Sequence, residues 1–272
     1  MQNFSISPVE MAKSLWRNRS LTKALIKREV VGRYKGSILG ILWSFFNPVL
    51  MLLVYTFFFS VVFKARWNSG SDSKTEFAIV LFAGLMVFNL FSECVSRAPG
   101  LILSNVSYVK KVVFPLEILP WVSLGSALFH GFVSFIVWLI FYCTTLGWPH
   151  LETLLFPVIL LPLILMTMGL SWFLASLGVF LRDAGQVIGM LMTTLMFISP
   201  VFFPISAMPE EYRFFLLFNP LTPVIEQGRA LIIWGIMPDW QMYAIYLLVG
   251  LIFAWLGFAW FQKTRKGFAD VL

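Results

Sequence analysis

Charged side chains are scarce in this chain. Asp, Glu, Lys and Arg make up 12% of its 272 residues, about half of the roughly 25% that is typical of soluble proteins. Apolar residues contribute 59%, and the mean hydropathy is +0.85. A soluble domain of this size cannot keep so much apolar surface away from water, and a disordered chain has the opposite composition. The composition therefore predicts a polytopic integral membrane protein.

The sequence also lacks the motifs of the common catalytic and metal sites. The run at 32–37 is too short to be a GxxxxGK[ST] phosphate loop, and no GxSxG, HExxH or EF-hand pattern occurs. Cys94 and Cys143 form no CxxC motif or Cys/His ligand set, so we expect two small buried apolar residues. We expect no enzyme activity, metal or cofactor on this chain, and no nucleic-acid partner. Residues 1–37 are polar and basic, without the apolar core of a signal peptide.

Ionisable residues are rare within the apolar runs, which argues against an ion-driven transporter. A proton relay at His130 would need an acid at the same depth, and the runs offer none near the middle of the membrane. We expect His130 to be a satisfied residue that faces the helix bundle. Glu210 and Glu211 are expected in a solvated turn. Energy for transport must then come from a partner.

Long uncharged runs predict an all-α fold with six transmembrane helices. A helix needs about 20 apolar residues to cross a bilayer, and lipid cannot satisfy the backbone amides of any open alternative. Residues 209–239 contain two shorter apolar pieces interrupted by Asn219-Pro220, Pro223 and Gly235, which predict two short re-entrant helices between spans five and six. The predicted spans are 38–63, 77–96, 118–147, 153–180, 185–206 and 240–262.

The distribution of basic residues predicts the orientation. With the N-terminus in the cytoplasm, 15 of the 20 Lys and Arg residues fall on the inner side. Basic residues are enriched in cytoplasmic loops. We therefore expect both termini in the cytoplasm, with residues 1–37 forming an interface segment, 38–262 the transmembrane domain and 263–272 a cytoplasmic tail.

Two cytoplasmic segments are long enough to contact a partner. Ser7 as N-cap and Pro8 at the next position predict a helix start, and a second helix is expected near Ser20. This second helix carries a basic stripe and is predicted to be an amphipathic interface helix, either as a topology signal on anionic lipid or as a platform for a cytoplasmic partner. The segment 97–115, bounded by Pro99 and Pro115, has the length and stiffness of a lever for a soluble ATPase.

Three stretches of sequence carry a resemblance to a known family. Residues 33–37 (RYKGS) are followed by Leu39-Gly40, Trp43 and Pro48, and residues 110–120 read KKVVFPLEILP. Residues 199–204 (SPVFFP) precede 219–223 (NPLTP), Glu226 and Arg229. From about residue 10 to 265 the chain resembles the ABC type 2 exporter permeases for polysaccharides. It looks most like the O-antigen (lipopolysaccharide) exporters, with capsule and teichoic acid exporters close behind.

This resemblance implies a multi-pass protein of the bacterial inner membrane that works as a homodimer. Two copies of a separate ABC ATPase would supply ATP and Mg²⁺, and the cargo would be a polyprenyl-linked polysaccharide. The short helices after span five would line the outer exit, with Asn219, Pro220, Glu226 and Arg229 in them. The implied ATPase contacts lie on the interface helix and on the loop between spans two and three: Lys23, Lys27, Arg28, Glu29, Arg33, Leu101, Val106, Tyr108, Lys110 and Lys111.

The aromatic content suits a path for sugars, because pyranose rings stack on aromatic faces while their hydroxyl groups stay solvated. A drug or small-lipid permease would share the topology, but the stretch 33–37 and the aromatic residues favour glycans. A membrane glycosyltransferase or acyltransferase would need clustered acids or a His–acid motif, and a passive channel would not need a coupling loop. Candidate path residues on spans one and five are Trp43, Phe46, Tyr55, Phe59, Phe197, Phe202 and Phe203.

Overall fold

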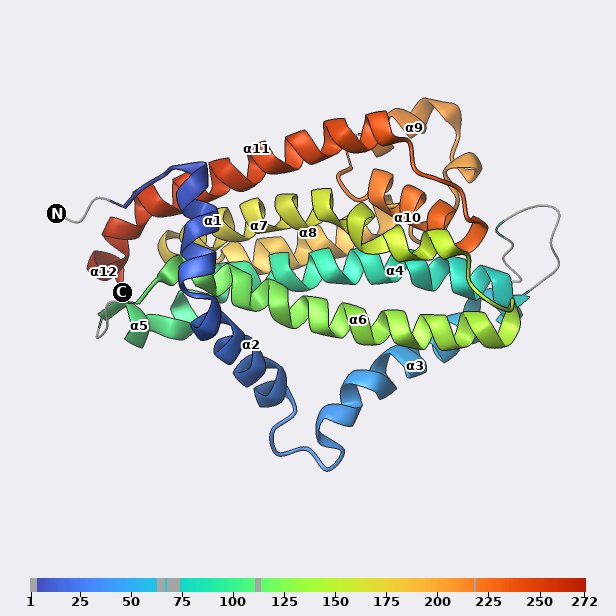
Figure 1. Cartoon of the computed structure of the whole chain (residues 1–272), viewed down its shortest axis with the longest axis horizontal. Helices are drawn as coiled ribbons and strands as arrows, with labels where there is room; N and C mark the ends of the chain where they lie inside the picture. Colours follow the sequence, from blue (N-terminus) through green and yellow to red (C-terminus); the bar gives the residue numbers. More distant parts are fainter. Residues whose placement is uncertain (1–3, 63–66, 68–73, 111–113, 218) are drawn as a thin grey trace.

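A computed structural model describes residues 4–62, 67, 74–110, 114–217 and 219–272. All regular structure within these residues is helical, which confirms the predicted all-α class. The α-helices, labelled as in Figure 1, are α1 (Pro8–Arg17), α2 (Arg19–Arg33), α3 (Trp43–Tyr55), α4 (Lys74–Arg97), α5 (Val106–Lys110), α6 (Leu119–Thr145), α7 (Phe156–Phe180), α8 (Ala184–Ile198), α9 (Glu210–Leu217), α10 (Thr222–Trp234), α11 (Trp240–Thr264) and α12 (Phe268–Val271).

Five helical segments are long and apolar enough to cross a membrane, and they match five of the six predicted spans. They are Gly40–Phe59, Thr75–Gly100, Leu116–Thr145, Leu151–Phe180 and Trp240–Val271. The fifth predicted span, 185–206, corresponds to α8, whose 15 residues end before Ser199-Pro200. At 1.5 Å per residue α8 is about 22 Å long, less than the roughly 30 Å of a hydrocarbon core. A sixth crossing therefore remains a prediction.

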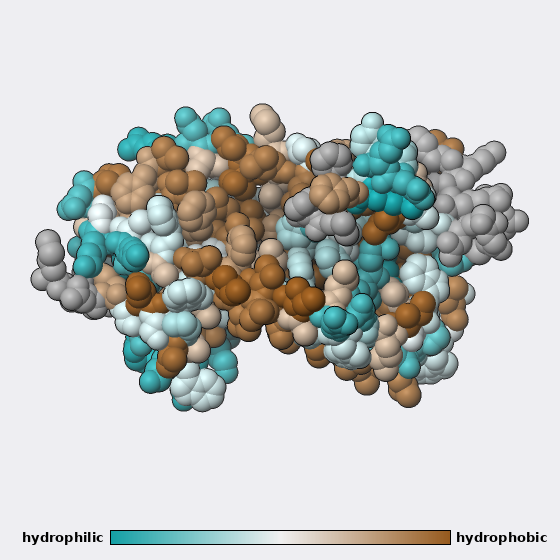
Figure 2. Space-filling model, turned by 90° about the horizontal axis from the view of Figure 1, so that it is seen from above, coloured by the Kyte–Doolittle hydropathy of each residue, from teal (hydrophilic) through white to brown (hydrophobic). Residues whose placement is uncertain are grey.

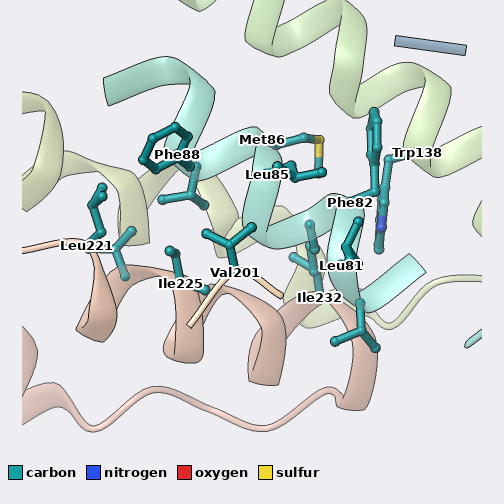
Figure 3. Close-up of a cluster of buried hydrophobic side chains, with 14 of the residues drawn as sticks. Leu81, Phe82, Leu85, Met86, Phe88, Trp138, Val201, Leu221, Ile225 and Ile232 are labelled. Atoms are coloured by element: carbon teal, nitrogen blue, oxygen red, sulfur yellow. The ribbon is translucent and has the colours of Figure 1, made fainter. Parts of the chain in front are cut away.

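Helix α4 lies at the centre of the bundle, with 83% of its most apolar stretch buried. Figure 3 shows Leu81 and Leu85 of α4 between Ile225 and Ile232 of α10 and Trp138 of α6. The indole Nε1 of Trp138 donates a hydrogen bond of 3.1 Å to the Ile79 carbonyl oxygen. Helix α4 is thus held by packing against α10 on one side and α6 on the other.

Helices α7 and α11 approach each other closely through glycines. A Cβ on Gly257 would collide with the backbone of Gly169, and a Cβ on Gly250 would lie 2.8 Å from the Pro162 carbonyl oxygen. Small residues at such crossings let helix backbones meet within a membrane. The outward face of α11 is apolar, with Ile245 60% and Leu248 59% exposed.

The surface agrees with a membrane location. In Figure 2 apolar side chains cover the middle of the face that carries α11, and hydrophilic residues gather toward the two ends of the molecule. Large exposed apolar areas of this kind are rare on soluble monomers.

Both termini lie at one end of the bundle, together with α5 and α12 (Figure 1). The short helices α9 and α10 lie at the opposite end. The predicted pair of short helices within 209–239 is therefore present, and α10 ends at Gly235, whose φ of 64° suits a residue without a Cβ.

Candidate functional site

A polar cavity of about 560 Å³ opens between α3, α4, α6 and the end of α2. The cavity has a polar lining for two reasons. Arg33 and Tyr34 lie at the end of the interface helix α2, and Asn47 and Asn89 lie within otherwise apolar helices. Further polar side chains around the cavity are Ser44, Ser92, Ser96 and Ser134. A space of this size with several hydrogen-bonding groups is the main candidate for a binding site in the described residues.

Glu93 carries the negative charge of this cavity. Its Oε1 atom lies 2.9 Å from Arg33 Nη1, 3.6 Å from Arg97 Nη1 and 3.4 Å from His130 Nδ1. These contacts are ion pairs, and their geometry is not that of hydrogen bonds. Glu93 Oε1 therefore has no hydrogen-bond donor among the described residues. A second carboxylate, Glu29 of α2, pairs with Arg97. Helix α2 is thereby joined to α4 by ion pairs at Arg33 and Glu29.

His130 takes part in the same cluster. Arg33 Nη1 lies 2.8 Å from its Nδ1 atom, and the Tyr34 hydroxyl lies 3.1 Å from its Nε2 atom. Arg33 Nη1 also lies 3.3 Å from Nε2, so the imidazole is held between Arg33, Tyr34 and Glu93.

The expectation that the apolar runs offer His130 no acid near the middle of the membrane overlooked Glu93, which stands near the end of its run. The packing of α4 against α6 brings the Glu93 carboxylate 3.4 Å from His130 Nδ1. The positions of Glu93 and His130 in the sequence do not show that they pair. An ionisable residue in an apolar run usually has a partner, however, and this rule applied to both residues.

The two predicted ATPase-contact segments touch each other. Arg28 Nη1 of α2 donates a hydrogen bond of 2.9 Å to the Tyr108 hydroxyl of α5. The Tyr108 ring stacks on Phe114, with centroids 4.3 Å apart. Lys110 donates to the backbone oxygen of Leu272, which joins α5 to the C-terminal segment. These contacts hold α2, α5 and α12 at the end of the bundle that contains both termini.

The structure separates the exposed members of the predicted contact set from a buried one. Lys23, Lys27, Arg28, Arg33 and Lys110 are exposed, and Glu29, Val106 and Tyr108 are half-buried. Leu101 is 8% exposed and packs in the core with Ile102, because the chain after Pro99 folds back onto the bundle. The Leu101 side chain is therefore not on the surface in this structure. Lys111 lies outside the described residues.

Four of the seven predicted path aromatics lie together. Phe59 stacks on Phe202, with ring centroids 5.6 Å apart, and Phe202 stacks on Phe197 at 5.8 Å. Tyr55 lies one turn from Phe59, at 6.4 Å, and lines the polar cavity. We call Tyr55, Phe59, Phe202 and Phe197 the aromatic row.

The other three predicted path residues are not in this row. Trp43 and Phe46 lie at the far end of α3, 39% and 45% exposed, and Phe203 is half-buried beside Phe202.

Arg229 of α10 is buried next to the aromatic row, with a 1% exposed side chain. Its guanidinium donates to the carbonyl oxygens of Val80 at 2.9 Å, Pro200 at 2.5 Å and Val201 at 2.6 Å. It also lies 4.3 Å from the centroid of the Trp67 ring. Burial lowers the pKa of Arg229 to about 10, so the side chain stays charged at neutral pH.

Of the remaining predicted exit residues, Glu226 contacts Arg229, whereas Asn219 and Pro220 have other partners. Glu226 Oε1 lies 3.3 Å from Arg229 Nη1, and burial raises the pKa of this carboxyl. Asn219 donates a hydrogen bond of 2.8 Å to Ser199 Oγ and accepts one of 2.9 Å from the Leu221 amide. The Pro220 carbonyl oxygen accepts from the Tyr246 hydroxyl of α11. The bonds from Arg229 satisfy the backbone oxygens of Pro200 and Val201, which the break at Ser199-Pro200 leaves without helical partners.

Residues 20–233 match the family model described as ABC-2 type transporter. The chain belongs to the ABC-2 type transporter family. It is 28% identical over 264 residues to the O-antigen export system permease protein RfbA of Myxococcus xanthus, covering 96% of this chain and 99% of the relative. The RfbA of Klebsiella pneumoniae is 25% identical over 93% of this chain and 95% of its own length. The polysialic acid transport protein KpsM of Escherichia coli is 26% identical over 94% of this ABC-2 chain and 98% of the relative.

Proposed function

We propose that this chain is the permease subunit of an ATP-driven exporter that moves a polyprenyl-linked O-antigen-type polysaccharide out of the cytoplasm. The observation that carries the proposal is the similarity to O-antigen export permeases along nearly the whole chain. Such a match includes the interface segment, the loop between the second and third spans and the short helices α9 and α10, rather than one shared module.

The proposal includes the assembly and the placement in the membrane. Two copies of the permease pair with two copies of an ABC ATPase, which binds ATP and Mg²⁺. This chain crosses the bacterial inner membrane six times, with both termini in the cytoplasm and α9 and α10 as re-entrant helices at the outer exit. The location of both termini at one end of the bundle supports an even number of crossings.

In this proposal, helices α2 and α5 couple the permease to the ATPase, and the aromatic row contacts the sugar chain. Helix α2 and segment α5, joined by Arg28 and Tyr108, receive the motion of the ATPase. The ion pairs of Arg33 and Glu29 carry that motion to α4. The aromatic row offers ring faces along which sugar units slide. Many weak stacking contacts suit a long chain that must not stop at a tight site.

Deletion of the gene in its own host tests the proposal. We expect loss of long-chain lipopolysaccharide from the cell surface and accumulation of lipid-linked glycan on the cytoplasmic side, with both restored by a plasmid copy. Normal surface glycans in the deletion strain would contradict export by this protein.

A capsule permease is the second candidate. It is favoured by the similarity to KpsM and to the capsule polysaccharide export inner-membrane protein CtrC of Neisseria meningitidis, which is 25% identical over 94% of this chain. The same deletion separates the two, because loss of capsule with unchanged lipopolysaccharide would identify the cargo as capsule.

A further inference from the structure

Helices α7 and α11 are joined along most of their length, beyond the two glycine contacts described above. Near the end of the bundle that holds both termini, the hydroxyl groups of Ser176 and Thr264 share a hydrogen bond of 2.7 Å. Toward the opposite end, the Tyr243 hydroxyl donates one of 3.1 Å to the Val158 carbonyl oxygen. Close backbone contact and hydrogen bonds hold helices together within a membrane. The two helices, which we call the α7–α11 pair, must therefore move together.

The end of this pair near the termini is attached to the segment that follows α5. Arg265, directly after α11, donates a hydrogen bond of 2.7 Å from Nη2 to the Phe114 carbonyl oxygen. The Phe114 ring in turn stacks on Tyr108 of α5. The Trp172 indole of α7 donates a hydrogen bond of 3.0 Å to the backbone oxygen of Glu117. Both members of the pair thus bind the backbone between α5 and the third span.

The opposite end of the pair contacts the short helices. The Tyr246 hydroxyl of α11 donates to the Pro220 carbonyl oxygen, in the turn between α9 and α10. Phe156 at the start of α7 packs on α10, where a Cβ on Gly228 would lie 3.1 Å from its ring. Figure 1 shows α11 running from the end with α12 to the end with α9. Tyr246 and Arg265 are 19 residues apart, which is about 28 Å at 1.5 Å per residue.

The two end contacts are attachments to segments rather than to single side chains. Phe114 and Pro220 both lie outside the regular helices, and each accepts through its backbone oxygen. A hydrogen bond weakens steeply once its geometry is lost. Neither segment can therefore shift unless its bond to α11 breaks or α11 shifts with it.

We propose that the α7–α11 pair transmits the motion of α5 to the short helices α9 and α10, with Arg265 and Tyr246 as the positioning residues at its two ends. Rigid secondary elements can carry coupling between distant sites when both sites bias the position of the element. This route is separate from the ion pairs of Arg33 and Glu29, which join α2 to α4. The source of the motion, an ABC ATPase that acts on α5, rests on the proposed function.

Cysteine labelling can follow α9 while nucleotide binds at the other end of the molecule. The sample is the permease assembled with its ATPase in nanodiscs. It carries Glu211→Cys, exposed at the start of α9, in a Cys143→Ser background, and Cys94 stays because it is buried. We expect the rate of maleimide labelling at this cysteine to change roughly fivefold between the nucleotide-free and the ATPγS-bound complex.

Two conservative variants interrupt the route at its ends. Arg265→Lys keeps a positive charge beside Glu117 but loses the fork that also reaches the Phe114 carbonyl oxygen. Tyr246→Phe keeps its ring and loses the bond to Pro220. Each variant should abolish the nucleotide-dependent change in labelling. The readout is the ratio of the rates in the two states, which a role in stability alone would leave in place.

Tyr243→Phe is the matched control, because it removes a hydroxyl three residues from Tyr246 that binds only within the α7–α11 pair. This variant should keep the response to ATPγS. An unchanged response in Arg265→Lys or in Tyr246→Phe would overturn the proposal, as would an equal loss in Tyr243→Phe or the lack of any response in the natural chain. The predicted labelling in a transporter whose deletion leaves surface glycans unchanged would contradict the proposed cargo and support the route through α11.

Discussion

Arg265 at the end of α11 is paired with Glu117 at the start of the third span, with 2.6 Å between Nη1 and Oε2. The other carboxylate oxygen of Glu117 accepts a hydrogen bond of 2.8 Å from the Ser14 hydroxyl of α1. Arg265 also donates to the Phe114 carbonyl oxygen at 2.7 Å. One buried carboxylate therefore joins the first helix, the loop between spans two and three and the last long helix.

Glu117→Gln should destabilise the protein strongly. Because the Arg265 side chain is only 12% exposed, the substitution leaves a buried guanidinium without its counter-charge. Removing one member of a buried pair costs about 3–5 kcal/mol. We expect the thermal unfolding midpoint of the detergent-solubilised chain to fall by several degrees. Glu10→Gln is the control, since its partner Arg17 is 61% exposed and the pair is expected to contribute less than about 1 kcal/mol. Equal stability of the two variants would contradict the joining role of Glu117.

The long helices and the first helix start were predictable from the sequence because their causes are local. Uncharged runs must be helical in lipid, and Ser7 caps α1 as expected, with its Oγ atom 3.3 Å from the Val9 amide nitrogen. The packing face of α2 depends on its tertiary neighbours. Leu25 is buried against Ile118 and Val122, whereas Leu21, one turn earlier, is 37% exposed.

The ion-pair cluster and the burial of Leu101 were not predictable, because both depend on which helices pack side by side. Glu93 and His130 lie on different spans, and only the crossing of α4 and α6 brings them within 3.4 Å. In the same way, the sequence around Leu101 suggests an exposed loop, and the fold of 98–105 against the bundle makes it part of the core. The sequence shows which ionisable residues are present, but only the packing of the helices determines which of them form pairs.

Cysteine labelling should place both termini in the cytoplasm and α9 and α10 outside. In a Cys143→Ser background, chosen because Cys143 is exposed, we expect a membrane-impermeant maleimide added to intact cells to label Glu211→Cys and Asp239→Cys. The same reagent should leave Gln2→Cys and Leu272→Cys unlabelled until the cells are opened. Labelling of Glu211→Cys and Asp239→Cys from opposite sides would show that the segment between them crosses the membrane.

Arg229→Lys and Gly84→Ala should impair export in the same way. A lysine cannot donate to the three carbonyl oxygens of Val80, Pro200 and Val201 at once, and a Cβ on Gly84 would clash with the guanidinium. Since both changes act on one interaction, the double variant should export no worse than either single one. The measurement is surface glycan per inserted permease, and additive losses would show that the two residues act separately.

Removal of rings from the aromatic row should slow export more than it lowers abundance. We expect Tyr55→Ala and Phe202→Ala each to lose about 1 kcal/mol of contact with sugar faces or with Phe59, a change of about fivefold in rate. Tyr55→Phe keeps the ring and should export normally. If both alanine variants export at the rate of the natural chain at equal abundance, the row does not contact cargo.

Trp43→Ala tests whether the sugar path extends to the end of α3 away from the row. Its ring is 39% exposed and lies on the same helix as Tyr55. We expect a loss similar to that of Tyr55→Ala if the path runs along α3. Normal export by Trp43→Ala together with slow export by Tyr55→Ala would restrict the path to the aromatic row.

The surface of α5 should transmit the motion of the ATPase. Leu101 is unsuitable for testing this because a charge there would disrupt the core, whereas Ser104 and Ser107 are exposed on the same segment. A partner moves a conformational equilibrium only through contacts that differ between its states. Introducing carboxylates at the contact should therefore uncouple ATP hydrolysis from export without affecting folding.

We expect Ser104→Asp combined with Ser107→Asp to insert and to keep its oligomeric state while export is lost. Ser206→Asp combined with Ala207→Asp, at the opposite end of the bundle, is the control and should export. A Ser107→Cys variant should also crosslink to the ATPase. If the Ser104→Asp, Ser107→Asp variant exports normally and the cysteine never crosslinks, α2 alone must carry the coupling, through the ion pairs of Arg33 and Glu29.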